Sequence, residues 1–138
     1  MHEVKLSSQA LQAAAGGCHA FAARRRARLI SQRYDTALAA HGLTIGQFSM
    51  LAALAGAGRM TVSQLSQLMG LEQSATSRGL MPLVRDGLVF SRPARRDGRV
   101  RVVSLTKGGT LRLNAASIDW AEVQDALTRE IAKDAALP

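Results

Sequence analysis

The sequence is poor in cysteine, in aromatic residues and in long apolar runs, and each shortage excludes a class of protein. One cysteine, Cys18, among 138 residues excludes an intramolecular disulfide and is typical of a reducing compartment. There is no apolar run of about 18 residues, and the N-terminus lacks the pattern of a signal peptide. Aromatic residues make up 4%, which favours close-packed helices over a β-sandwich. We therefore predict a mainly helical, cytoplasmic protein without a membrane partner.

The chain is strongly basic, and its positive charge is unevenly distributed. Eighteen Lys and Arg residues against ten acidic residues give a net charge of +8. Residues 1–58 carry +4 (six basic, two acidic), residues 59–106 carry +5 (eight basic, three acidic), and residues 107–138 carry −1 (four basic, five acidic). Such a charge favours a polyanionic partner, with nucleic acid ahead of an anionic membrane surface. The segment 107–138 is not expected to touch the polyanion.

The length of the chain predicts a single domain. In its first 70 residues, capping residues indicate where helices begin and end. A first helix is expected from about 18 to 40, with one apolar stripe and Gly42 as its C-cap. Two capping boxes follow, in which a threonine precedes a glutamine by three residues. They are Thr44 with Gln47 and Thr61 with Gln64, and they predict helices at about 45–55 and 62–69.

A third predicted helix, at about 73–85, completes a helix-turn-helix pattern. Gly70 ends the preceding helix, and after a short turn the new helix opens with small hydroxyl residues. Small side chains let the backbone approach the floor of a DNA groove, while hydroxyls bond to bases or phosphates. The side chains expected to face DNA are Gln73, Ser74, Thr76, Ser77 and Arg78.

Two short strands joined by an arginine-rich loop follow that helix. The strands are expected at about 88–90 and 100–105, and they form a β-hairpin known as a wing. Five arginines in this region are candidates for DNA contact, because Arg suits a narrow minor groove better than the more tightly hydrated Lys does. They are Arg92, Arg95, Arg96, Arg99 and Arg101, with Asp97 as the only acid among them.

The last third of the chain is predicted to be helical after Thr106, which serves as an N-cap. Its apolar stripe becomes irregular near Ser117, which predicts two helices with a bend. One small domain has little core left for these apolar residues and for those of the first helix. Pairing with a second copy of the chain would bury them.

The order of these motifs resembles the MarR family of winged helix-turn-helix bacterial transcriptional regulators. The matching stretches cover about residues 21–124. They are Arg33-Tyr34-Asp35, Gly42-Leu43-Thr44 with Gln47-Phe48, Asp86-Gly87-Leu88-Val89, and Asp97-Gly98-Arg99 leading through a strand into Leu105-Thr106. The resemblance implies that residues of about 43–106 form the winged helix-turn-helix, and that about 18–42 and 107–138 form dimerisation helices.

The resemblance also implies what the parts do. A homodimer would place two recognition helices in successive major grooves of a pseudopalindrome. We expect the regulator to be a repressor rather than an activator. At the wing tip, Arg99 would enter the minor groove, and Asp97 would orient the wing through an ion pair. Many family members release DNA when a small aromatic or phenolic compound binds, which makes Tyr34 and Phe48 candidates for an effector pocket; core packing explains both equally well.

Other functions have weaker support in the sequence. Cys18 lies near the position of the reactive cysteine in peroxide-sensing members of the family, although the accompanying tyrosines are missing and a lone cysteine is usually inert. The histidines lack metal-ligand spacing, and we expect neither a metal, a cofactor nor an enzymatic site. An architectural DNA-binding protein with little sequence preference is the remaining alternative.

Overall fold

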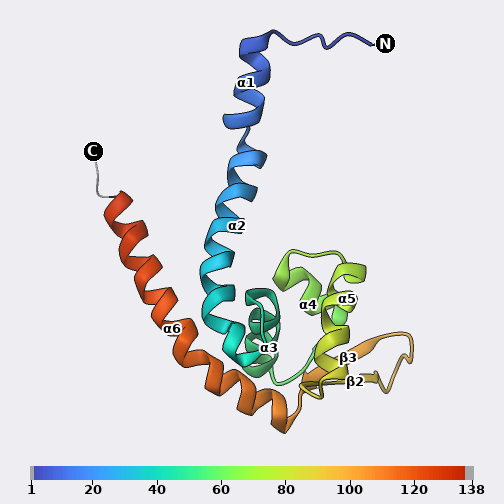
Figure 1. Cartoon of the computed structure of the whole chain (residues 1–138). Helices are drawn as coiled ribbons and strands as arrows, with labels where there is room; N and C mark the ends of the chain where they lie inside the picture. Colours follow the sequence, from blue (N-terminus) through green and yellow to red (C-terminus); the bar gives the residue numbers. More distant parts are fainter. Residues whose placement is uncertain (1, 136–138) are drawn as a thin grey trace. The chain divides into compact units, whose positions relative to one another are not determined.

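The computed structural model describes residues 2–135 and consists mainly of helices (Figure 1). The helices are α1 (Ser8–Gly16), α2 (His19–Leu38), the 3-10 helix η1 (Ala39–His41), α3 (Ile45–Ala57), α4 (Val62–Met69), α5 (Gln73–Arg85) and α6 (Lys107–Ala135). The strands are β1 (Met60–Thr61), β2 (Val89–Pro93) and β3 (Arg101–Leu105). The chain divides into two compact units, residues 1–33 and 34–138. This fold confirms the predicted class, a mainly helical protein with a small β-hairpin.

The first unit contains α1 and most of α2. Helix α1 was not predicted, and it begins at a cap in which Ser7 Oγ accepts a hydrogen bond of 3.1 Å from the backbone N–H of Ala10. None of residues 2–33 is buried. This unit therefore has apolar side chains but no core of its own.

The second unit holds the hydrophobic core, and local capping signals set where its helices begin. Both predicted capping boxes are present, with Thr44 and Thr61 each accepting from the glutamine three residues later. Gly42 and Gly70 close the preceding helices in the left-handed conformation that glycine adopts most readily. The largest fully buried apolar side chains are Leu38, Leu51, Leu54, Leu65, Leu83 and Val103.

The sheet has three antiparallel strands in the order β1-β3-β2. The hairpin of β2 and β3 confirms the predicted wing, with Val89 opposite Leu105 and Pro93 opposite Arg101. Strand β1 was not predicted, because its two residues have too short a pattern to signal a strand. It pairs with the edge of β3 that faces away from β2, and Thr61 lies opposite Val102.

Helix α6 corrects the expectation of two helices separated by a bend. It is one helix of 29 residues, and the Ser117 hydroxyl that interrupts the apolar stripe bonds to the Leu113 carbonyl one turn earlier. Thr106 caps it as predicted, accepting from Gly109 N–H and donating to the Gly87 carbonyl. The start of α6 is thereby held against the start of the wing.

Among residues 2–135, no single helix is long and apolar enough to cross a membrane. One bent pair, residues 8–41 with Ile45–Ala57, meets that test of length and composition only when its two parts are taken together. The second part of the pair supplies Phe48, Met50, Leu51 and Leu54 to the core.

Candidate nucleic-acid interface

The first part of the candidate interface is the exposed N-terminal half of α5. Helix α4 ends at Gly70, and three residues later α5 begins after Glu72. The side chains of Gln73, Ser74, Ser77 and Arg78 are exposed there. They offer hydroxyl, amide and guanidinium groups on one helical surface, which are the groups that bond to base edges and phosphates. The helix continues through Pro82 to Arg85.

Thr76 does not belong to that surface, so the prediction that its side chain contacts DNA is wrong. The residue is fully buried, and its Oγ1 donates to the Glu72 carbonyl at 3.1 Å. Ser66 on α4 is also buried, and its Oγ lies 2.9 Å from Thr76 Oγ1. The two hydroxyls join α4 to α5 in an otherwise apolar interior. Thr76 therefore fixes the crossing of the two helices.

Replacing Thr76 with Val tests this structural role. The substitution keeps the shape of the side chain but removes the hydroxyl, and the partners left behind retain one other hydrogen bond each. We expect the free energy of unfolding to fall by about 1 kcal/mol, measured by urea denaturation. Thr110→Val, which removes an exposed hydroxyl on α6, is the matched control and should change it by less than about 0.5 kcal/mol. Equal effects of the two substitutions would refute the role.

The wing is the second part of the candidate interface, and its tip is ordered by Asp97. The Asp97 carboxylate accepts from the backbone N–H of Arg99 at 3.1 Å and from its Nε at 3.2 Å. These bonds hold the pKa of Asp97 below its usual value. The Arg99 side chain is nevertheless 92% exposed. The predicted ion pair is thus present, and it leaves the guanidinium of Arg99 accessible to a partner.

The remaining wing arginines differ in how they are held. Arg101 donates from Nε and Nη2 to Ser91 Oγ across the hairpin, at 3.2 and 3.0 Å. Arg92, Arg95 and Arg96 are exposed. The structure therefore brings all five predicted wing arginines to an accessible surface.

The two candidate effector residues are packed in the core. The hydroxyl of Tyr34 donates to Gln124 Oε1, and the ring of Phe48 stacks on Trp120 with centroids 5.5 Å apart. Core packing, the alternative left open above, accounts for both side chains.

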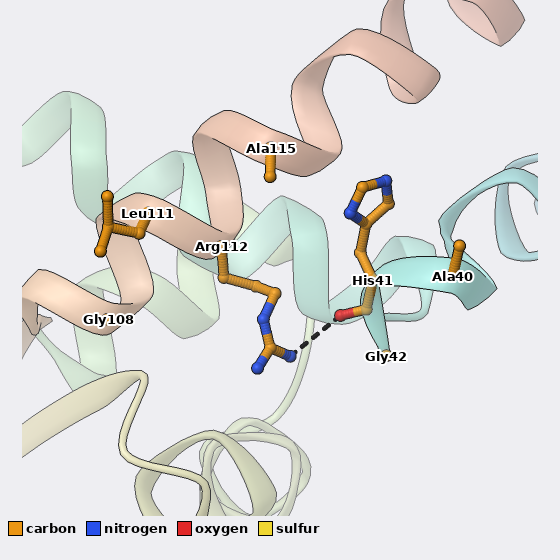
Figure 2. Close-up of a pocket in the computed structure, with 7 residues that line it drawn as sticks. All are labelled: Ala40, His41, Gly42, Gly108, Leu111, Arg112 and Ala115. Atoms are coloured by element: carbon orange, nitrogen blue, oxygen red, sulfur yellow. Dashed lines mark hydrogen bonds between the residues drawn. The ribbon is translucent and has the colours of Figure 1, made fainter.

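A hollow of about 590 Å³ lies instead between η1 and the start of α6 (Figure 2). Its polar groups are His41 and Arg112, and Arg112 Nη1 donates to the His41 carbonyl at 2.9 Å. The imidazole of His41 lies 2.6 Å from the carboxylate of Asp119. The rest of the lining consists of Ala40, Gly42, Gly108, Leu111 and Ala115. This hollow could not be predicted from the sequence, because it forms from two segments that are distant along the chain, residues 40–42 and 108–115.

The described part of the chain contains no group of three or more potential metal-ligating side chains. Cys18 is exposed and lies immediately before α2. Hydrogen bonds from the backbone N–H groups of Phe21 and Ala20 lower the pKa of its thiol.

An exposed surface on the second helix of a helix-turn-helix, followed by a β-hairpin rich in arginine, defines a winged helix-turn-helix DNA-binding protein. A family model described as the MarR family matches residues 41–100. The transcriptional regulator MosR of M. tuberculosis, solved in complex with DNA, is 34% identical to this chain. That alignment covers 86% of this chain and 91% of MosR, with a TM-score of 0.76. The chain belongs to the MarR family, whose members are transcriptional regulators.

Two further comparisons agree in fold. A second MosR structure is 33% identical, with a TM-score of 0.71 over 86% of this chain and 90% of that one. A mutant of MarR from E. coli, complexed with operator DNA, has a TM-score of 0.64 over 80% of this chain and 87% of that one. At 23% identity it shows the shared fold alone. Comparison with curated proteins finds no match.

Proposed function

We propose that this regulator is a repressor that binds a pseudopalindromic DNA site as a homodimer in the cytoplasm. The main support for the proposal is that the protein has both an exposed polar surface on α5 and a set of exposed arginines on the wing. An α-helix and a β-hairpin in this order suit adjacent major and minor grooves. Asp97, the one acid of the wing loop, is already paired with Arg99 and adds little repulsion toward phosphates.

Exposed apolar side chains support the homodimer. Helix α6 exposes Leu111, Ile118 and Ile131, and α2 exposes Phe21 and Leu29. Large apolar side chains that gather on the helices of a small protein usually mark an interface. The family relationship makes a second copy of this chain the partner that we propose for them.

The proposal is tested by selecting bound fragments of the source genome with the purified full chain. We expect the enriched fragments to share an inverted repeat whose half-sites lie about one helical turn apart. Native mass measurement of the complex should give two chains per duplex. Enrichment of a single unrepeated site, or one chain per duplex, would contradict the homodimer.

We also propose that a small aromatic compound relieves repression. The support is the hollow beside His41 and Arg112, which combines apolar walls with two groups able to hold a carboxylate or a phenolic oxygen. Because one wall is the start of α6 and the other follows α2, a ligand there would touch both segments that precede and follow the DNA-binding region.

Cys18 supports a second candidate, a redox-responsive regulator. Its lowered thiol pKa raises the thiolate fraction, and the thiolate is the form that hydroperoxides oxidise to sulfenic acid. Its exposure makes the sulfur accessible to such an oxidant.

Cys18→Ser separates the two candidates. We expect the variant to bind DNA with the affinity of the untreated wild type, because Cys18 is not among the α5 and wing residues that we propose to contact DNA. The measurement is a DNA titration before and after hydrogen peroxide treatment. If oxidation acts through Cys18, peroxide releases DNA from the wild type and not from the variant. Identical responses of the two proteins would remove the redox candidate.

A further inference from the structure

Three arginines from separate segments surround one hollow on the sheet. Arg59 comes from the connection between α3 and β1, Arg92 from β2, and Arg95 from the wing loop. The hollow has a volume of about 430 Å³, and its other walls are Pro93, Ala94 and Val102. None of the six lining residues is acidic.

The register of the sheet explains why Arg59 approaches the wing. Val102 on the central strand lies opposite Thr61 on one side and Arg92 on the other. Paired residues in adjacent strands point to the same face, so Val102 and Arg92 share a face with Thr61. Arg59 lies two residues before Thr61, and alternation along the chain returns it to that face. The sequence did not single out Arg59, because only the unpredicted pairing of β1 with β3 brings it there.

Among the described residues, these three arginines differ from Arg99 and Arg101 of the wing in having no partner for their side chains. Arg99 is paired with Asp97, and Arg101 is bonded to Ser91. Within residues 2–135, by contrast, Arg59, Arg92 and Arg95 have no hydrogen bond or ion pair from their side chains. Like charges gathered around one hollow repel each other, and an anion placed among them removes that repulsion.

We propose that Arg59, Arg92 and Arg95 form a phosphate-binding site and that the DNA backbone beside the wing supplies the phosphate. Guanidinium groups bind phosphate oxygens through paired N–H donors, and three of them can share the oxygens of one group. The inference rests on the proposed DNA-binding function. It extends the interface beyond α5 and the hairpin to Arg59, which would position the protein on the duplex without reading its sequence.

The test measures how the affinity for a random-sequence duplex of 30 base pairs depends on salt, so no operator is needed. Each lost phosphate contact reduces the slope of log affinity against log salt by about 1. We expect this reduction for Arg59→Gln and for Arg95→Gln. Arg129→Gln on α6 removes the same charge from an exposed helix outside the site and should leave the slope unchanged. Thermal unfolding of each variant verifies that these exposed substitutions preserve the fold.

A second arm uses pyrophosphate without DNA and separates the two sources of phosphate. If the slope is unchanged in Arg59→Gln, but pyrophosphate raises the melting temperature of the wild type and not of that variant, the site binds a free phosphate compound and the DNA source is wrong. If neither measurement distinguishes Arg59→Gln from Arg129→Gln, the site itself is refuted. Neither of these results bears on whether the wild type binds DNA selectively, which the fragment selection tests. Failure of the site and failure of the proposed function are therefore distinguishable.

Discussion

Gly109→Ala should lower the free energy of unfolding by about 2 kcal/mol, although alanine is ordinarily the better helix former. A Cβ atom at this position would lie 2.1 Å from the main-chain oxygen of Leu88. No rotamer change relieves a clash with backbone, so α6 must move away from the start of β2. Overpacking of this kind costs about 1–3 kcal/mol and occasionally more, and helix propensity returns only about 1 kcal/mol. Movement would also disturb the Thr106 cap, which receives the Gly109 N–H.

The matched control is Gly108→Ala, which should change the free energy of unfolding in the opposite direction. A Cβ atom on Gly108 would lie 3.4 Å from the Gly87 oxygen and 3.6 Å from Thr106 Oγ1, distances that a small adjustment accommodates. We expect Gly108→Ala to raise the free energy of unfolding by about 0.5–1 kcal/mol, because it removes the entropy cost of a helical glycine. Urea denaturation of both variants gives the comparison. Stabilisation by both substitutions would show that α6 does not lie as close to Leu88 as described.

Arg99→Ala should weaken binding to a selected operator duplex by about 1–3 kcal/mol, which is roughly 5- to 150-fold in affinity. The guanidinium is exposed, and Asp97 holds its backbone and Nε in place at the tip of the wing. A preorganised arginine at this position suits the enhanced negative potential of a narrow, A·T-rich minor groove. The loss should therefore be larger on a duplex with A·T flanks than on one with G·C flanks.

The measurement is a titration of both duplexes at one salt concentration. Arg99→Lys is the matched control, because it keeps the charge but cannot form the paired bonds of a guanidinium to Asp97. It should retain part of the affinity and lose most of the preference for A·T flanks. Unchanged binding of Arg99→Ala to both duplexes would remove the wing tip from the mechanism.

The helix boundaries of the DNA-binding region could be predicted from the sequence because local chemistry determines them. A threonine with a glutamine three residues later satisfies N–H groups at the same helix start wherever the helix packs. Glycine after the last turn likewise satisfies the end of a helix without long-range help. Thr44, Thr61, Gly42 and Gly70 therefore gave correct boundaries. The Asp97–Arg99 pair spans two residues and was accessible to the same kind of reasoning.

Features that depend on contacts distant in sequence could not be predicted. Thr76 and Ser66 have hydroxyl side chains, which are usually exposed on a helix. Only the crossing of α4 and α5 buries them against each other. Strand β1 has only two residues, which is too short for an alternating pattern in the sequence. Its pairing with β3, and with it the position of Arg59 beside the wing, was therefore missed. Ser117 interrupted an apolar pattern without interrupting the helix, because its hydroxyl bonds within α6.

We propose that α5 and the wing together recognise a specific DNA site, and this proposal is tested by the ratio of two affinities. The measurement is a pair of titrations at one fixed salt concentration, with a duplex selected from the source genome and with a scrambled duplex of the same length and composition. We expect the selected duplex to bind about 10³-fold more tightly, or more, than the scrambled duplex. Equal affinity for the two duplexes would contradict it and would identify the chain as an architectural DNA-binding protein.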